Sequence, residues 1–328
     1  MGNAIINTLT VRRFPAPSAI LELLKPITWF PPMWAFACGV IATGVSFEGR
    51  WHLLIAGVIL AGPMVCAASQ AVNDWFDREV DAINEPQRPI PSGRMPGTWG
   101  LYVACIWTGL SLLLGWLISP WAFAATLLGL LLAWLYSMPP ARFKQNGWYG
   151  NAACGISYEG LAWFTGSAVM MGDLLPSTPS ILLAILYSIG AHGIMTLNDF
   201  KAIEGDRKMG VLSLPVQLGI AGAAQNACLM MLAPQFGVVG LLLVWGAYWQ
   251  ALVILLLIAG QIKMMHYFLQ DPVKRALFLS GFGYLLTKRH TYTSGIKQSY
   301  LYLHIQTSNA LCILISLQSC CSLNRLLA

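Results

Sequence analysis

The sequence predicts an all-α protein, a transmembrane bundle of eight to nine helices. Hydrophobic residues make up 57% of the 328 residues and charged residues only 10%, whereas a soluble domain carries about 25% charged residues. A water-soluble fold would expose much of this apolar surface, so a soluble enzyme, a disordered chain and a disulfide scaffold are not expected. The net charge of +6 forms no basic stripe on a soluble face, and no nucleic-acid partner is expected.

Eight apolar runs are each near the length that crosses about 30 Å of hydrocarbon as a helix. A helix satisfies its own backbone hydrogen bonds in lipid, which a lone strand cannot do. Proline and glycine mark many of the expected ends, with Pro26 at the first run, Gly97 at the third and Pro120 at the fourth. The expected spans are residues 27–47, 52–72, 98–118, 120–138, 150–171, 181–197, 221–242 and 244–262.

Basic residues lie almost entirely on one side of these spans. They precede the first span or follow spans two, four, six and eight, and the opposite side has only Arg50 before the tail. The residues on the basic side are Arg12, Arg13, Lys25, Arg78, Arg88, Arg94, Arg142, Lys144, Lys201, Arg207, Lys208, Lys263, Lys274 and Arg275. Because cytoplasmic loops carry an excess of Lys and Arg, the N-terminus and these loops are expected in the cytoplasm.

Two acidic clusters lie on that same side. Residues 73–81 read NDWFDREVD after span two, and residues 198–207 read NDFKAIEGDR after span six. If span two continues as a helix, residues 73, 77 and 81 recur every four positions and share a face with residue 74. Like charges on one face are tolerated when they are solvated or when a cation lies between them. Carboxylate oxygens suit Mg²⁺, which is typically shared with substrate phosphates.

The repeated Asn-Asp pair indicates two similar halves whose clusters face each other across the bundle. Such an arrangement is able to hold a diphosphate through bridging metal ions. For either cluster alone a solvated helix end is the alternative, but two matched clusters on one side favour a shared site. Glu159 lies inside the fifth span, where an ionisable residue is costly and indicates a function. A neutral carboxyl bonded to a neighbouring helix is the alternative for Glu159.

The acidic loops resemble the motifs of a known family, the UbiA-type intramembrane prenyltransferases. The pattern Asn73-Asp74-x-x-Asp77-x-x-x-Asp81 looks like the first aspartate-rich motif of that family. Residues 73–94, 144–151, 155–166 and 197–219 are similar, in order, to the chlorophyll and bacteriochlorophyll synthases, and the resemblance covers about residues 20–280. The stretch SYEGLAW, which contains Glu159, looks more like the bacteriochlorophyll branch.

This resemblance implies a helical bundle around a central cavity that opens to the cytoplasm and sideways to lipid, in a photosynthetic inner membrane. It implies a Mg²⁺-dependent enzyme that esterifies the propionate of a (bacterio)chlorophyllide with geranylgeranyl or phytyl diphosphate and releases diphosphate. The nucleophile is then the substrate carboxylate, which is ionised at neutral pH, so no strong protein base is needed. The implied partners are the two substrates and the lipid bilayer, with other pigment-pathway proteins as an open alternative.

The resemblance also implies roles for individual residues. Mg²⁺ on the two clusters would neutralise the charge of the leaving diphosphate, with Arg and Lys as further clamps. The expected metal ligands are Asn73, Asp74, Asp77, Asp81, Asp199 and Asp206, and Asp74, Asp77, Asp199 and Asp206 are also the expected catalytic residues. The expected diphosphate contacts are Arg142, Lys144, Lys201 and Arg78, although Lys201 and Arg78 also have nearby acids with which to pair.

Aromatic side chains are candidates to line the apolar cavity, because π faces stabilise an allylic cation. The candidates are Trp29, Trp34, Phe36, Trp163 and Phe164, with ordinary packing as the alternative for each.

The chain divides into a membrane domain, residues 1–279, and an atypical tail, residues 280–328. Asp271 is the last acid, and Ser, Thr, Tyr and Leu dominate the tail. The family normally closes with a further apolar span, which the tail does not resemble. We expect that out-of-frame translation has replaced the natural final span. Reading the other frames of the gene from codon 279 tests this expectation, because one of them should encode an uncharged span.

Other functions stay open from the sequence. A chlorophyll a synthase, or a UbiA-type transferase with an aromatic acceptor as in quinone or haem O synthesis, shares the Asp motifs. The aromatic-acceptor enzymes should lack the NEPQRPIPSG and SYEGL runs. A transporter or channel predicts charges within the spans, whereas in this chain they cluster in loops. A non-catalytic pigment-binding protein is an alternative if the altered tail abolishes turnover.

Overall fold

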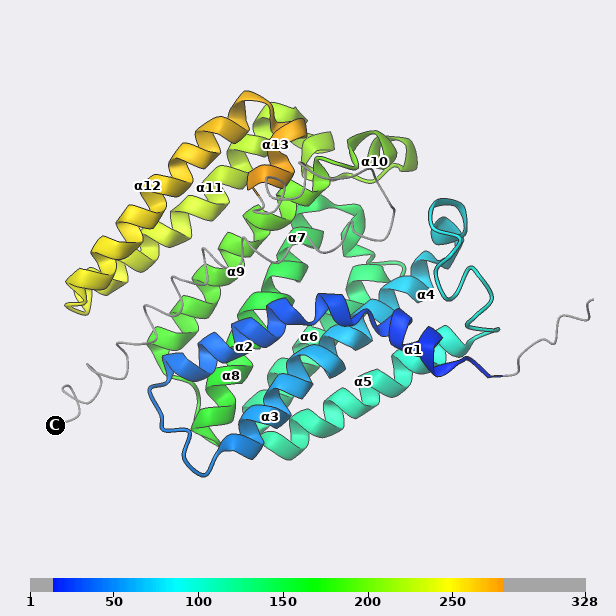
Figure 1. Cartoon of the computed structure of the whole chain (residues 1–328), viewed down its shortest axis with the longest axis horizontal. Coiled ribbons are helices and arrows are strands. Elements are labelled where there is room, and N and C mark those ends of the chain that lie inside the picture. The colour runs from blue at the N-terminus through cyan, green and yellow to red at the C-terminus, as the bar shows by residue number, and fades with distance from the viewer. Residues whose placement is uncertain (1–13, 280–328) are drawn as a thin grey trace, which may run out of the picture.

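The computed structural model describes residues 14–279, and this part of the chain is almost entirely helical (Figure 1). Within it there is no β-strand, and the one isolated β-bridge joins Asn146 to Leu212. The long helices lie side by side as a bundle. The predicted all-α class is confirmed. Residues 1–13 and the tail from residue 280, including its expected frameshift, lie outside the described residues.

The helices follow one another with short connections. The first half contains α1 (Pro17–Leu24), η1 (Pro26–Thr28), α2 (Phe30–Ala42), α3 (Trp51–Ile59), η2 (Leu60–Cys66), α4 (Ala67–Asn84), α5 (Trp99–Ile118) and α6 (Pro120–Ser137). The second half contains η3 (Phe143–Gln145), α7 (Gly147–Gly155), η4 (Ile156–Gly160), α8 (Leu161–Met171), α9 (Thr178–Asp199), α10 (Ile203–Met209), α11 (Leu214–Val244), α12 (Tyr248–Gln270) and α13 (Pro272–Leu279). The segments α3, η2 and α4 form one continuous rod, and so do α7, η4 and α8.

Six helical segments of the described chain are long and apolar enough to cross a membrane, so the protein is a multi-pass membrane protein. They are Trp51–Asn84, Trp99–Ile118, Pro120–Ser137, Thr178–Asp199, Leu214–Val244 and Tyr248–Gln270. Six of the eight expected spans are thereby confirmed.

The other two expected spans differ from the prediction. The span expected at 27–47 contains α2, which has only 13 residues. It is short because Lys25, with a φ of 47°, separates α1 from the following turn, and Gly44, with a φ of 68°, follows the end of α2. The span expected at 150–171 is helical from residue 147 to 171, but it is rich in glycine and carries the polar side chains of Asn151 and Glu159.

The rod α7–η4–α8 is held against α2 by two glycines that allow close backbone contact. A Cβ atom at Gly39 would lie 1.9 Å from the carbonyl oxygen of Trp163, and one at Gly166 would lie 2.0 Å from the carbonyl oxygen of Phe36. Small residues at such crossings let membrane helices approach, since lipid supplies no hydrophobic force between them. The crossing fixes the position of η4, which runs directly into α8.

Two of the segments are π-helical. They are η2, which contains Pro63, and η4, which contains Glu159. A π-helical turn inserts one residue and shifts the side chains that follow it, and such turns are frequent at functional sites. Both segments contribute to the cavity described below.

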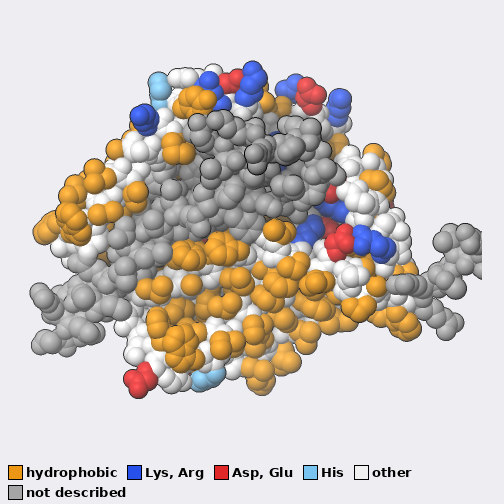
Figure 2. Space-filling model, in the orientation of Figure 1, with side chains coloured by type: hydrophobic (Ala, Val, Ile, Leu, Met, Phe, Trp, Pro, Cys, Tyr) orange, Lys and Arg blue, Asp and Glu red, His pale blue; other side chains and the backbone are white. Residues whose placement is uncertain are grey.

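The surface separates into an apolar part and a charged edge. Figure 2 shows hydrophobic side chains over α2, α3 and α5, whereas Lys, Arg, Asp and Glu gather at the edge formed by α10 and the end of α4. Several large apolar side chains face outward. Trp51, Trp116 and Leu117 are examples, and each is more than half exposed. A surface of this kind is stable in contact with lipid, and it agrees with the assignment of the long helices as membrane spans.

Candidate active site

A cavity of about 430 Å³ lies inside the bundle. Its walls come from α2, the rod α3–η2–α4, α6, the rod α7–η4–α8 and α9. At one end it is lined by Asn73, Asn198 and Lys201, and further inside by Val65 and Ala61. Asn73 and Ala61 are twelve residues apart on one rod, so the cavity extends about 18 Å from its polar end into the span.

The first acidic motif continues span two as a helix, as predicted. Its Asp74 forms ion pairs with Lys25, which lies between α1 and η1, and with Arg88 in the loop after α4. The carboxyl oxygen Oδ1 of Asp74 lies 2.6 Å from Nζ of Lys25 and 3.4 Å from Nη1 of Arg88. The same Nη1 atom lies 2.8 Å from Oδ2 of Asp81, and Nε of Arg88 lies 3.1 Å from Glu85. Burial lowers the pKa of Arg88, but these three carboxylates outweigh it and hold that pKa above its usual value.

The other side of the motif faces the loop after α6. Asp77 accepts a hydrogen bond from Nζ of Lys144, and Nη2 of Arg142 lies 4.0 Å from its Oδ1 atom. One turn earlier, Nδ2 of Asn73 donates to Oγ of Ser137 at 3.2 Å. Asp74 and Asp81 therefore share Arg88 as a basic partner, whereas Asp77 has Lys144 and Arg142. The two sets of contacts divide the single helical face that the spacing predicts.

The second acidic motif begins at the last turn of α9. Asp199 is the last residue of α9 and accepts a hydrogen bond from Nδ2 of Asn151 at 3.2 Å. Asp206 on α10 and Lys201 both act on the Asp199 carboxyl electrostatically. Burial raises the pKa of Asp206. Carboxylates of α9 and α10 thus lie together beside Lys201, which lines the cavity.

Each motif contributes its asparagine to the lining of the same cavity, although the motifs lie far apart in the sequence. The aspartates of the motifs lie next to these asparagines in the chain but are not among the lining residues. Asn73 and Asn198 both line it, and so does Tyr136, which is within electrostatic range of both Asp77 and Asp199. The loops that carry the basic and acidic residues are also joined through the backbone. The N–H of Leu212 donates to the carbonyl of Gln145 at 2.8 Å. The loop after α6 is therefore fixed against the connection between α10 and α11 at the polar end.

The donors at this end suit magnesium without forming a finished cage. Among residues 14–279, no group of three or more His, Cys, Asp or Glu side chains is arranged to hold a single metal ion. Mg²⁺ usually takes one or two carboxylates and completes its shell with water and substrate phosphates, so such a group is not required. The oxygen Oδ2 of Asp74 is buried and has no hydrogen-bond partner, so the ion pairs with Lys25 and Arg88 leave one oxygen of this carboxylate unpaired. The residues therefore fit the metal.

Some residues singled out in the sequence lie elsewhere. Arg78 stacks on the ring of Trp75 at 4.5 Å and pairs with Glu79 at 3.5 Å, so it is not brought to the motif carboxylates. The aromatic candidates Trp29, Trp34, Phe36, Trp163 and Phe164 are not among the residues that line this cavity, which favours the alternative of ordinary packing. Phe36 and Trp163, for example, pack in hydrophobic clusters with neighbouring helices.

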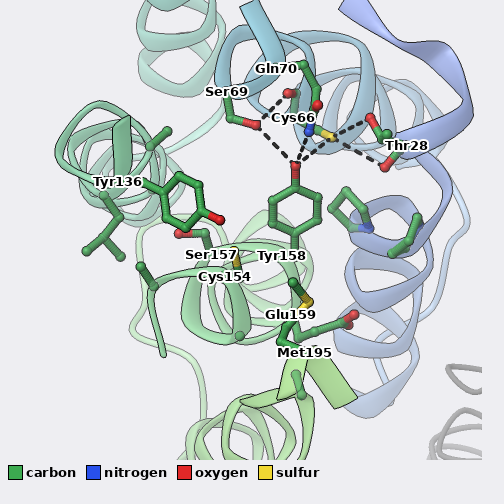
Figure 3. A pocket seen from close by; sticks show the side chains of 18 of the residues that line it. Thr28, Cys66, Ser69, Gln70, Tyr136, Cys154, Ser157, Tyr158, Glu159 and Met195 are labelled. Carbon is green, nitrogen blue, oxygen red and sulfur yellow. Dashed lines mark hydrogen bonds between the residues drawn. The ribbon is translucent and has the colours of Figure 1, made fainter. Parts of the chain in front are cut away.

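The aromatic side chains that do line the cavity are tyrosines, as Figure 3 shows. The hydroxyl of Tyr158 accepts a hydrogen bond from Nε2 of Gln70 at 2.6 Å and lies 3.2 Å from Oγ of Ser69. It also lies 3.6 Å from Sγ of Cys66. This network joins η4 to the rod η2–α4 across the cavity.

Sequence reasoning also missed Lys25 and Arg88 as partners of Asp74, and Asn151 as the partner of Asp199. The sequence predicts only that Lys25 and Arg88 lie on the basic, cytoplasmic side of the spans. Arg88 lies in the segment 73–94 and Asn151 in the segment 144–151, both of which carry the family resemblance. For Arg88 and Asn151 that resemblance is the available signal, because neither residue lies on the same helix as its acidic partner.

The fold and the site together define a multi-pass helical membrane protein with an internal cavity that is polar at one end. The model of the UbiA prenyltransferase family matches residues 28–291. The chain belongs to the UbiA prenyltransferase family and is a prenyl-transferring enzyme. Among solved structures, digeranylgeranylglyceryl phosphate synthase aligns with a TM-score of 0.70 at 22% identity, covering 92% of this chain and 98% of that one. A UbiA homolog from Archaeoglobus fulgidus bound to GPP and Mg²⁺ aligns with a TM-score of 0.61 at 18% identity, covering 92% and 99%.

Two relatives indicate which branch of the family the chain resembles. It is 50% identical over 279 residues to the bacteriochlorophyll synthase 33 kDa chain of Cereibacter sphaeroides, covering 85% of this chain and 92% of the relative. It is 42% identical over 269 residues to the chloroplastic chlorophyll synthase of Avena sativa, covering 77% of this chain and 69% of the relative. The resemblance stated from the four sequence segments is thereby confirmed.

Proposed function

We propose that this protein joins a prenyl group to the propionate of a bacteriochlorophyllide, forming bacteriochlorophyll and releasing diphosphate. The observation that carries the proposal is the convergence of both Asn-Asp motifs on one cavity, with Lys144 and Lys201 beside them. The 50% identity to a bacteriochlorophyll synthase supports the choice of acceptor. A chlorophyllide is the second candidate acceptor, favoured by the 42% identity to a chlorophyll synthase.

In the proposed reaction, a carboxylate oxygen of the propionate attacks the allylic carbon of the prenyl diphosphate. The bond from that carbon to the diphosphate oxygen breaks, and its electron pair leaves with the diphosphate. The barrier falls when the negative charge that grows on the leaving group is neutralised. When bound, Mg²⁺ supplies part of that neutralisation as a Lewis acid. The proposed ligands are Asn73, Asp74, Asp77, Asp81, Asp199 and Asp206, with one or two carboxylates engaged at a time.

The basic side chains supply the rest of the positive charge. Lys144 and Arg142 are held at the site by Asp77, and Lys25 and Arg88 are held by Asp74. A diphosphate bound next to either pair would take over these contacts, since phosphate oxygens accept the same charge-assisted hydrogen bonds. The ion pairs thus keep the cations in place before the substrate arrives.

The interior of the cavity is suited to the hydrocarbon part of the substrate. Val65, Leu132 and Ile194 are among its lining residues. Closing this space around the prenyl chain excludes water, which would otherwise capture an allylic cation. The N-terminus and the polar loops are proposed to face the cytoplasm of a photosynthetic inner membrane, on the basis of the excess of Lys and Arg on that side. Residues 1–279 are proposed as the catalytic domain, because every assigned residue lies within it.

The proposal is tested by supplying membranes that contain the full chain with bacteriochlorophyllide, geranylgeranyl diphosphate and Mg²⁺. Esterified pigment, separated by chromatography, is the expected product, and chelation of the metal should abolish it. Chlorophyllide in a parallel reaction distinguishes the two candidate acceptors. Prenylation of a quinone precursor, with no esterified tetrapyrrole, would overturn the proposal.

Lys144 should make the reaction sensitive to alkaline pH. Burial lowers the pKa of its ammonium group, with Arg142 acting in the same direction and Asp77 and Asp81 opposing it. An ordinary lysine has a pKa near 10.4. The charged form of Lys144, which binds diphosphate, is therefore lost at a lower pH than the charged form of an ordinary lysine. We expect kcat/KM to fall as pH rises through this lowered value. Lys144→Arg should move that fall to higher pH, because arginine stays protonated. An unchanged alkaline limb in the variant would show that Lys144 is not the titrating group.

A further inference from the structure

Glu159 lines the cavity, but the reaction described above does not use it. It lies in η4 and is only 5% exposed. Along the rod α7–η4–α8 it is eight residues beyond Asn151, the partner of Asp199. Eight helical residues correspond to about 12 Å. Glu159 is therefore well removed from the end of the cavity where the diphosphate is proposed to bind.

Only one of the two carboxyl oxygens of Glu159 has a hydrogen-bond partner. The side chain of Tyr187 on α9 hydrogen-bonds its carboxyl group, while the oxygen Oε2 is buried and has no partner. None of the ion pairs within residues 14–279 includes Glu159. In apolar surroundings without a cation, a carboxyl group is more stable neutral than charged. One oxygen then accepts from Tyr187, and the other carries a hydroxyl with no acceptor.

This unsatisfied atom is distinctive among the residues around the cavity. Several buried side chains of the described chain have an atom without a partner, but Glu159 is the one among them that lines the cavity. The adjacent Tyr158 differs, because its hydroxyl is already engaged with Gln70 and Ser69 (Figure 3). A buried donor without an acceptor is costly, so the occupant of this part of the cavity should supply the acceptor.

Neither the prenyl chain nor the diphosphate supplies that acceptor. An isoprenoid is a hydrocarbon and leaves the hydroxyl unpaired, and the diphosphate binds at the polar end. The tetrapyrrole does carry suitable groups. A bacteriochlorophyllide has a ring ketone and also, in its acetyl-bearing forms, an acetyl carbonyl. Both are hydrogen-bond acceptors on an otherwise apolar ring system.

We propose that Glu159 is a specificity-determining residue that donates a hydrogen bond to a carbonyl oxygen of the acceptor ring, an inference that rests on the proposed function. A site built to hydrogen-bond a substrate group discriminates against an analogue that lacks it. The effect expected for one such bond is about 10- to 100-fold in kcat/KM. The diphosphate is proposed to bind about 12 Å away, at the polar end, so the KM for prenyl diphosphate should change less than the preference between acceptors.

The test compares wild type with two substitutions at this position. Glu159→Gln keeps a donor, through its amide, and Glu159→Leu removes it at similar size. Two pairs of acceptors are used, one differing only by acetyl in place of vinyl and the other by ring ketone in place of methylene, so that one member of each pair lacks the carbonyl acceptor. Gln250→Leu is the matched control. Gln250 is also buried in a membrane helix with an unpartnered oxygen, but it does not line the cavity.

Wild type should prefer the carbonyl-bearing member of one pair by about 10- to 100-fold, and the pair identifies which carbonyl is bound. Glu159→Leu should remove this preference, whereas Glu159→Gln and Gln250→Leu should retain most of it. A preference that survives in Glu159→Leu, or a loss that is equal for all four acceptors, would overturn the role of Glu159. Wild type alone also decides the matter, because equal use of both members in both pairs contradicts the proposal. A failure to esterify any tetrapyrrole would instead refute the proposed function.

Discussion

Asp199→Asn is expected to lower kcat by about three orders of magnitude while the protein stays folded. Asp199 is a half-buried carboxylate at the end of α9, and its contact with Asn151 is a hydrogen bond that an asparagine carbonyl also accepts. The substitution therefore removes the negative charge with little change of shape. If this charge binds the metal–diphosphate group, the leaving group loses stabilisation in the transition state. Single-turnover formation of esterified pigment measures the effect directly.

The matched control for this variant is Asp173→Asn. Asp173 is an exposed acid in the connection between α8 and α9, at the opposite end of α9 from Asp199. Its replacement should leave kcat within about twofold of wild type, since exposed substitutions away from a site have small effects. Near-wild-type turnover in Asp199→Asn would remove this residue from the site.

Asp77→Asn is expected to lower kcat/KM by about 10²- to 10³-fold. Asp77 holds Lys144 and lies near Arg142, so its loss removes a proposed metal ligand and also releases two of the cations that would bind diphosphate. The KM for prenyl diphosphate should therefore rise as kcat falls. Initial rates at varied prenyl diphosphate and Mg²⁺ concentrations separate these two effects.

Glu79→Gln is the control for Asp77, because it lies two residues further along the same helix. Its side chain is 87% exposed and pairs only with Arg78 among the described residues. It changes the local charge by the same amount but does not touch Lys144. If Glu79→Gln and Asp77→Asn have equal effects, general loss of negative charge at the membrane face explains both, and the assigned role of Asp77 is contradicted.

Much of the fold follows from the sequence because lipid restricts the choice of structure. Long apolar runs must be helical there, and this predicts α5, α6 and α9 nearly to their ends. The span expected at 150–171 agrees closely with the rod α7–η4–α8, which is helical from residue 147 to 171, although glycines and polar residues interrupt its apolar character. The limits of α2 depend on the backbone conformations of Lys25 and Gly44, which hydropathy does not report.

The site was predicted in part, for equally physical reasons. The repeated Asn-Asp pair shows that two segments are alike, and Asn73 and Asn198 do line one cavity. The partner of a carboxylate, however, depends on the path of a loop. Arg88 reaches Asp74 and Asp81 only because the chain turns back after α4, which no helical repeat encodes.

The cavity lining was the least predictable part of the site. Aromatic content indicates that rings are available but not which side of a helix faces inward. The π-helical turns shift the side chains around them, so a regular helical repeat does not give the orientation of Tyr158 or Glu159.

The central claim is that the two acidic motifs act together on one metal-bound diphosphate. Mg²⁺-dependent binding of geranylgeranyl diphosphate to wild type, Asp77→Asn, Asp199→Asn and the double variant tests it most directly. Residues that act as a unit are strongly non-additive, so the double variant should bind little more weakly than either single variant. Losses in the two single variants that simply multiply in the double variant would show two independent sites and contradict the account.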